Sequence, residues 1–518
     1  MGANSRKVDL DQAGQPRAGR WWALAALVSS GLVIGLDSTV LITALPTLSA
    51  KLGATTSDLQ WITAAYTLAL GGLLLPGGVL GDRYGRKRLL LIGLAIFGIS
   101  SVAASQVSSS AALIVMRAVM GLGAALILPL SLSILPSLFS DAERPKAVSV
   151  AAAGAFLGLP LGPLVAGWLL THYAWGSVFL INAPVVLIAL LGIWLLVPEG
   201  RDPEPPPFDV VGGILAVAGV TVLVYGVIEQ PTHGWSDARV LVGTIGGSLT
   251  LALFVAWDVR HRSPFIALRN FGNRAFTWAT VAFVMTGFAL FGVMFILTPY
   301  IQIVMGNDAQ GTGIKLLPLI AGVIGGAGIG NMGARRFGAR VGVPAGLIVT
   351  AGGLLILSRA GSGTGYGLVA TALAVIGIGL GTALPTSLDI VLGVLPRSQT
   401  GAGSALTRAL QQVAASFGVA ILGSILNNAY QAQLEPHLAS LPAAAAAVAR
   451  GSIAGAVAVS SHLPAGLGAP LAAATKDAYS QGMAEVMLVS AALMLLAAVS
   501  IALFMPSVIT SIDGRESS

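Results

Sequence analysis

The chain has 518 residues, of which 55% are apolar and only 9% are charged. A water-soluble domain carries about 25% charged residues, so most of this protein's surface must face lipid. The net charge of +7 is spread over short clusters between apolar runs, which argues against nucleic acid as a partner. Since the sequence has no cysteine, disulfides, thiolate metal sites and cysteine nucleophiles are excluded.

Residues 1–20 are polar and are expected to form a cytoplasmic tail, because the apolar run after them is too long for the core of a signal peptide. A helix of about 20 apolar residues crosses the hydrocarbon core of a bilayer. By this criterion the sequence predicts an all-α polytopic membrane protein with fourteen spanning helices. The expected spans are 21–48, 58–80, 89–106, 111–138, 147–170, 177–197, 210–229, 239–257, 276–302, 312–333, 343–358, 366–394, 401–427 and 483–505.

The cations are concentrated in alternate loops, and such loops are cytoplasmic by the positive-inside rule. The loops rich in cations contain Arg83, Arg86, Lys87, Arg88, Arg144, Lys146, Arg201, Arg260, Arg262, Arg269, Arg274, Arg335, Arg336, Arg340 and Arg397. The opposite loops contain scattered cations such as Lys51, Arg239, Arg359, Arg450 and Lys476. An even number of spans then places both termini in the cytoplasm, and we expect the chain in the cell membrane.

The spans divide into two halves with an insertion between them. We expect a six-helix bundle at 21–200, two inserted linker helices at 201–262 and a second six-helix bundle at 263–505, followed by a cytoplasmic tail at 506–518. Within the second bundle, residues 430–482 are too weakly hydrophobic for a span. They are expected to form an extracellular loop or a short hairpin.

The loop after the second span holds glycines and charges in a fixed order: Gly78, Asp82, Arg83, Gly85 and Arg86. The glycines allow a tight turn between two helices. Asp82 can bond a neighbouring arginine in one conformation and release it in another. The loop is therefore predicted to be a conformational latch, the alternative being a basic turn with no further role.

The fifth span contains glycines spaced by four residues, Gly154, Gly158 and Gly162, which lie on one helix face. Pro163 follows directly and frees a backbone carbonyl, and Gly167 continues the series. Small residues let a neighbouring helix approach closely. We predict a gating helix, with ordinary small-residue packing as the alternative.

Several of these segments resemble motifs of the major facilitator superfamily. The loop at 78–88 closely resembles its signature loop, and residues 113–123 resemble its fourth-helix motif. Residues 154–167 resemble the fifth-helix motif of its antiporters, and residues 36–46 resemble the first-helix motif of its fourteen-helix drug/proton antiporters. The resemblance implies the major facilitator fold, with two six-helix bundles and two inserted helices. It also implies proton-driven export of bulky, often cationic compounds.

Asp37 lies in the middle of the first span, where an ionised carboxylate is costly and usually functional. Arg117 lies in the fourth span. At 1.5 Å per residue the two are about 16 Å and 10 Å deep, a difference that an arginine side chain covers. The family resemblance links this arginine with proton movement, so the pair is predicted to couple protons to export. The alternative is a permanent packing pair.

A second pair, Asp389 in span 12 and Arg408 in span 13, is a further candidate for proton coupling. The two could form an ion pair in the second half, or both could reach separately to the cytoplasmic interface. Some relatives carry acids in span 13, whereas this segment reads Thr407-Arg408-Ala409-Leu410-Gln411-Gln412. That departure puts divalent cations in doubt as substrates.

Aromatic side chains are candidates for the substrate cavity, because they bind flat cations by stacking and cation–π contacts. Trp61 and Tyr66 lie on span 2, and Phe288, Phe291 and Phe295 recur at helical spacing on span 9. The alternative is that they pack in the core or face lipid.

The sequence contains no nucleotide-binding P-loop, and it lacks the zinc-protease and nucleophile-elbow patterns. We therefore expect no enzyme activity, no cofactor and no metal, with the proton gradient as the energy source. The expected partners are small lipophilic or cationic substrates, protons and membrane lipids, and the chain is expected to act as a monomer. The alternatives are an exporter of a lipid-like or natural-product substrate on the same fold, and a membrane sensor that transports nothing.

Overall fold

The computed structural model describes residues 19–140, 143–201, 209–261, 268–337, 339–395, 400–439 and 441–506. These residues form helices joined by short turns, with no strand among them. The predicted terminal tails, apart from residues 19, 20 and 506, lie outside the described residues.

The first half of the chain forms a bundle of helices. It contains α2 (Arg20–Leu52), α3 (Thr56–Tyr84), α4 (Arg86–Ala104), α5 (Ser110–Ser133), α6 (Leu135–Leu138), α7 (Arg144–His172), α8 (Ser177–Leu180) and α9 (Asn182–Leu196). Local sequence explains the first boundary. Gly53 adopts a positive φ of 64° after α2, and Thr55 and Asp58 form a reciprocal capping box that starts α3.

The insertion and the second half are also helical. The insertion contains α10 (Val210–His233), α11 (Ala238–Leu241), η2 (Val242–Gly246) and α12 (Gly247–Arg260). The second half contains η3 (Leu268–Gly272), α13 (Arg274–Pro299), η4 (Tyr300–Val304), α14 (Ala309–Lys315), α15 (Leu317–Phe337), α16 (Ala339–Leu357), α17 (Tyr366–Val394), α18 (Thr400–Leu438), α19 (Ala443–Gly451), α20 (Ile453–His462) and α21 (Ala465–Phe504).

Every predicted span coincides with a helix or with helices in direct succession. Thirteen helical stretches in the described part of the chain are long and apolar enough to cross a membrane. The remaining predicted span, 147–170, falls within α7, which has 29 residues. At 1.5 Å per residue a helix of that length reaches about 44 Å, more than the hydrocarbon core requires.

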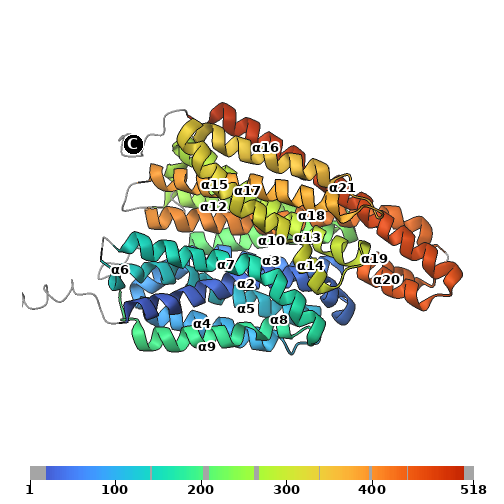
Figure 1. Cartoon of the computed structure of the whole chain (residues 1–518), viewed down its shortest axis with the longest axis horizontal. Helices are drawn as coiled ribbons and strands as arrows, with labels where there is room; N and C mark the ends of the chain where they lie inside the picture. The colour runs from blue at the N-terminus through green and yellow to red at the C-terminus, as the bar shows by residue number, and fades with distance from the viewer. Residues whose placement is uncertain are drawn as a thin grey trace, which may run out of the picture.

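The two halves lie side by side (Figure 1). Helices α2 to α9 form the lower bundle in that view, and α13 to α21 form the upper one. The bundles meet along α3 and α18, and also where α7 meets α14. Helix α10 packs against both α3 and α18, so the inserted pair covers the seam between the halves.

Of the two forms expected for residues 430–482, a loop or a short hairpin, the structure has a hairpin built of helices. Helices α18 and α21 continue past the rest of the bundle, and α19 and α20 form a helical hairpin between them (Figure 1). This segment is therefore helical for most of its length. Alanine is the strongest helix former, and an Ala-rich segment can be helical without being apolar enough to span a membrane.

Candidate functional site

The ion pair between Asp37 and Arg117 lies in the first bundle. Arg117 Nη1 of α5 donates to Asp37 Oδ2 of α2 at 2.7 Å, and each residue is only 1% exposed. Removing two charges from water is costly unless they are paired and hydrogen-bonded. The pairing predicted from depth in the sequence is thus present in the structure, in a site from which water is excluded.

Two further polar residues, which the sequence analysis did not identify, complete this cluster. Asn182 Nδ2 donates to Asp37 Oδ1 and to Ser101 Oγ, both at 3.1 Å. Asn182 and Ser101 are fully buried. A scan for amides inside apolar spans could have found Asn182, but nothing in the sequence pairs it with a residue 145 positions earlier.

Tyr66 and a backbone carbonyl hold the other side of the guanidinium. Arg117 Cζ lies 4.2 Å from the centre of the Tyr66 ring, which is the geometry of a cation–π contact. Arg117 Nε also donates to the carbonyl of Ile62 at 3.3 Å. Tyr66 therefore belongs to the Asp37 site, where it contacts the arginine.

Three of the predicted latch residues, Asp82, Gly85 and Arg86, meet at the turn between α3 and α4, whereas Gly78 lies within α3 beside Pro129 and Arg83 lies over the Tyr84 ring. Arg86 Nε donates to Asp82 Oδ1 at 2.8 Å, and Arg86 Nη1 donates to the carbonyl of Ser133 at the end of α5. Gly85 has a φ of 112°, a conformation that favours glycine. The Glu199 carboxylate accepts hydrogen bonds from the backbone amides of Lys87 and Arg88. This turn therefore ties α3, α4 and α5 to the segment after α9.

The predicted gating glycines contact two different partners. Gly154, Gly158 and Gly162 face α2, and a Cβ on Gly158 would lie 2.6 Å from the carbonyl oxygen of Leu32. Gly167 instead faces α14 of the second half, where a Cβ would lie 2.6 Å from the Cα of Gln310. Pro163 also borders α14. Helix α7 thus packs closely on α2 and reaches the other half at its far end.

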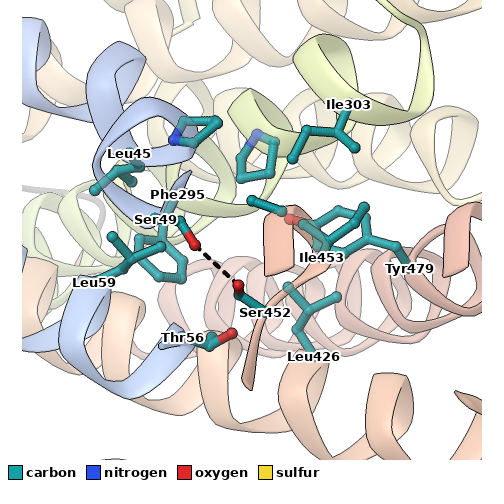
Figure 2. Close-up of a pocket in the computed structure, with 13 residues that line it drawn as sticks. Leu45, Ser49, Thr56, Leu59, Phe295, Ile303, Leu426, Ser452, Ile453 and Tyr479 are labelled. Atoms are coloured by element: carbon teal, nitrogen blue, oxygen red, sulfur yellow. Dashed lines mark hydrogen bonds between the residues drawn. The ribbon is translucent and has the colours of Figure 1, made fainter. Parts of the chain in front are cut away.

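A small cavity lies at the end of the bundle that carries the α19–α20 hairpin (Figure 2). Its volume is about 30 Å³, whereas ligand pockets are usually about 300–1,000 Å³. Its lining residues come from both halves and from the hairpin: Leu45, Pro46, Ser49, Thr56, Leu59, Phe295, Pro299, Ile303, Leu426, Ser452, Ile453, Ala454 and Tyr479. The cavity is too small for a drug-sized molecule, so this end of the structure is closed.

The hairpin contributes to this closure through bonds to the first half. The Ser49 hydroxyl of α2 donates to Ser452 Oγ at 2.9 Å (Figure 2), and Thr56 of α3 donates to the carbonyl of Gly451 at 3.1 Å. The hairpin is itself tied to α18, because Arg450 binds both carboxylate oxygens of Glu435 at 2.6 and 2.7 Å. That contact lowers the pKa of Glu435.

Hydrogen bonds also close the seam between α3 and α18. Gln60 Nε2 donates to the carbonyls of Val419 and Ala420 at 3.1 and 2.9 Å. One to two helical turns further along α3 and α18, the hydroxyl oxygens of Thr67 and Ser416 lie 2.5 Å apart. Thr67 directly follows Tyr66, which contacts Arg117. In the described part of the chain, hydrogen bonds between the two bundles therefore extend from the level of the Asp37 site to the hairpin.

The second candidate pair is not joined. Among the described residues, no hydrogen bond or ion pair connects Asp389 of α17 with Arg408 of α18. Asp389 is exposed and Arg408 is partly buried. Arg408 lies on the stripe of α18 between Gln411, which meets Gly287 of α13, and Gln412, which meets Gly71 of α3. Arg408 therefore lies on the face of α18 that is turned toward the junction of the two halves.

The predicted aromatic cavity residues are distributed over separate places. Trp61 packs against Tyr225 of α10, with ring centres 6.1 Å apart, so it belongs to the seam with the insertion. Phe295 lines the closed cavity. Phe288 is 7% exposed and Phe291 is partly buried. Among the described residues, no ring contact that the structure shows joins these four residues to one another or to Tyr66 beside Arg117.

The structure thus has two packed helical bundles, a buried ion pair inside the first bundle and a pair of helices across the seam between them. The family model described as Major Facilitator Superfamily matches residues 27–419, and the chain belongs to this superfamily. It is a multi-pass membrane protein and not an enzyme.

Similar proteins support this assignment. The chain is 32% identical to the multidrug efflux pump LfrA of Mycolicibacterium smegmatis, over 92% of this chain and 95% of that protein. It is 31% identical to the tetracenomycin C resistance and export protein of Streptomyces glaucescens, over 93% and 91%. Among solved structures, a bacterial homologue of the human lysosomal transporter Spinster, inward-facing and unoccupied, shares the fold with a TM-score of 0.68. Its sequence identity is 17%, over 95% of this chain and 98% of that chain.

Proposed function

We propose that the protein is a proton-coupled exporter of lipophilic, cationic compounds that works by alternating access. The observation that carries the proposal is the ion pair of Asp37 with Arg117, both 1% exposed within a spanning bundle. The names of its relatives, a multidrug efflux pump and a resistance and export protein, support export as the direction of transport.

The chemistry of the pair suits an exchange. A carboxylate deep in a membrane protein is energetically costly, and such residues are usually functional. When ionised, Asp37 has Arg117 as its counter-charge and can attract a cation. When protonated, it loses that attraction, so the binding of a proton and the binding of a cation exclude each other. This exclusion is the condition for antiport.

The surrounding elements supply the conformational change. The bonds between the halves, from Gln60 to the α19–α20 hairpin, must open for release on that side. The Asp82–Arg86 contact and the α7 glycines are proposed as the latch and the gating helix. By the positive-inside rule the closed side is extracellular and both termini are cytoplasmic, in the cell membrane. We propose that one chain is the functional unit and that no cofactor is needed.

Arg408 favours a second candidate, the export of an acidic natural product. Its guanidinium has no hydrogen-bond or ion-pair partner among the described residues, and Arg408 lies on the face of α18 that is turned toward the junction of the two halves. A cation in that position would attract an anionic cargo, and one relative is named for the export of tetracenomycin C.

The test is transport in proteoliposomes with an imposed proton gradient, using ethidium as the cation and carboxyfluorescein as the anion. We expect gradient-dependent movement of ethidium by the wild type and none by Asp37→Asn. Asp308→Asn is the matched control, because Asp308 caps α14 and asparagine caps equally well. Ethidium movement that survives Asp37→Asn would refute the role of Asp37. Movement of carboxyfluorescein alone, reduced by Arg408→Gln, would favour the second candidate.

A further inference from the structure

Behind Asp37 lies a chain of hydrogen bonds that the scheme above does not use. It runs from Asp37 through Asn182, the first residue of α9, to Ser101 of α4 and ends at the carbonyl of Phe179 in α8. Asp37, Asn182 and Ser101 are each at most 1% exposed. Among these described residues, the amide oxygen Asn182 Oδ1 is buried without a hydrogen-bond partner, whereas the other polar atoms of the chain are bonded. The direction of those bonds is informative because a buried polar group is costly when it is left unsatisfied.

The chemistry of Ser101 fixes the direction of the chain. A hydroxyl has one hydrogen to donate, and the Ser101 hydroxyl donates it to the Phe179 carbonyl at 2.8 Å. Ser101 Oγ can therefore only accept from Asn182. The Asn182 amide must then present its nitrogen to Ser101 and, with its second hydrogen, to Asp37. The opposite amide orientation would place the single amide oxygen of Asn182 against two acceptors, Ser101 Oγ and Asp37 Oδ1.

The break between α8 and α9 makes this geometry possible. Pro184 has no N–H to donate to the carbonyl of Leu180, and the helix is interrupted at Ile181. Asn182 thus starts α9, and the Phe179 carbonyl lies at the end of α8, where it accepts the Ser101 hydroxyl. In the segment Asn182-Ala183-Pro184, the asparagine amide and the proline that interrupts the helix are only two residues apart.

The result is a carboxylate with a donor on each oxygen. Arg117 donates to Oδ2 and Asn182 donates to Oδ1, and hydrogen bonds to a charged acceptor are the strong ones. The other titratable group that faces this site among the described residues is Tyr66, beneath Arg117. Helix α7 meets α2 here through glycine, since Gly158 lies against Leu32 and Leu36.

We propose that Asn182 and Ser101 are positioning residues that hold Asp37 in its ionised form, so that the proton is taken up only when this chain loosens. The proposal deepens the proposed function, since it concerns the same carboxylate. It assigns to α4 and α9, which lie outside the contact between the halves, a part in setting when Asp37 is protonated.

The test is an infrared titration of the purified full-length protein in lipid vesicles, without any substrate. The carbonyl band of protonated Asp37 is identified by its loss in Asp37→Asn, and its midpoint pH is compared between variants. Loss of one donor to the carboxylate favours the protonated form. We therefore expect the midpoint to rise by about one pH unit in Asn182→Leu, a tenfold change in proton affinity. In Ser101→Ala it should rise in the same direction by less.

The matched control is Ser100→Ala. Ser100 is buried next to Ser101, but its hydroxyl bonds only to carbonyls of its own helix, so its loss should leave the midpoint unchanged. Ser101→Thr keeps the hydroxyl and should titrate as the wild type. A carbonyl band of protonated Asp37 that is seen in Asn182→Leu and Ser101→Ala but not in the wild type would also support the proposal.

Equal midpoints in the wild type, Asn182→Leu and Ser101→Ala would overturn the proposal, as would the absence of a titrating band in all of them. Ser101→Ala keeps the test open if Asn182→Leu fails to fold. Ethidium transport by the same vesicles tests the proposed function separately. A shifted midpoint without ethidium movement would leave the positioning role intact and count against the export of cations.

Discussion

Ser49 and Ser452 are separated by 403 positions in the chain, yet their hydroxyl oxygens lie 2.9 Å apart. Ser49 belongs to α2 of the first half, and Ser452 caps α20 in the hairpin of the second half. Together with Thr56 and Gly451, they join the halves at the closed end. Release of a substrate on this side requires that these contacts separate.

The first prediction follows from this contact and from the absence of cysteine in the sequence. The double variant Ser49→Cys/Ser452→Cys should form a disulfide under mild oxidation, because the two side chains already meet. Ethidium transport should stop on oxidation and return on reduction, since the halves can no longer separate. The single variants should be insensitive to oxidant. Full transport by the cross-linked protein would show that this end need not open.

The second prediction concerns the energy of the buried ion pair. Arg117→Met leaves an unpaired carboxylate at a position that is 1% exposed, and breaking a buried pair in this way costs about 3–5 kcal/mol. The Tm of the purified protein should fall clearly. Asp37→Asn/Arg117→Met removes both charges and should recover most of the loss. A single variant as stable as the wild type would mean that Asp37 is readily neutralised or reaches water.

The third prediction concerns the close contact of α7 with α2. In Gly158→Ala the new Cβ would lie 2.6 Å from the Leu32 carbonyl oxygen and from the Leu36 nitrogen, and backbone atoms cannot rotate away. Overpacking costs about 1–3 kcal/mol, so we expect a lower Tm and slower ethidium transport. Gly325→Ala on α15 is the control, because no atom lies within 4 Å of its Cβ. Alanine there should stabilise the helix by up to about 1 kcal/mol. Equal effects of the two substitutions would argue against a special packing role for Gly158.

The fourth prediction concerns the turn between α3 and α4. Asp82→Asn weakens the bond to Arg86, whose side chain is 28% exposed, and an ion pair of this kind contributes about 0–1 kcal/mol to stability. The Tm should therefore change little. If the contact is a latch, ethidium transport should fall severalfold while ethidium binding to the purified protein stays unchanged. Unchanged transport would show that the turn is a basic connection between helices and not a latch.

Much of the fold could be predicted because apolar runs of span length have few other uses. The predicted span 366–394 matches the bounds of α17, and the predicted depths of Asp37 and Arg117 agree with their contact. The first result depends only on the length of one apolar run. The second depends only on the rise per residue along a helix.

The parts that could not be predicted depend on contacts between distant segments. Asn182 acquires its role from Ser101 and Asp37, and sequence spacing does not relate these three. Trp61 could have faced a cavity, but it meets Tyr225 because α10 crosses the seam. The sequence predicts a loop or a short hairpin at 430–482 but not the helices α19 and α20, because hydropathy detects long apolar spans and does not detect short, weakly apolar helices.

The inserted helix α10 has two faces of different character. Toward α18 it forms directional bonds, since Ser424 donates to the Val227 carbonyl and Asn428 donates to Gln230. Toward α3 the structure shows only apolar contact among the described residues, with Val224 and Ile228 packed against Ala64 and Leu68 in a cluster that also includes Ala420 of α18. Apolar surfaces lose little when they slide by a fraction of a helical turn, whereas hydrogen bonds break. We therefore expect the inserted helices to move together with the second half. The first half would then tilt along the apolar contact between α3 and α10.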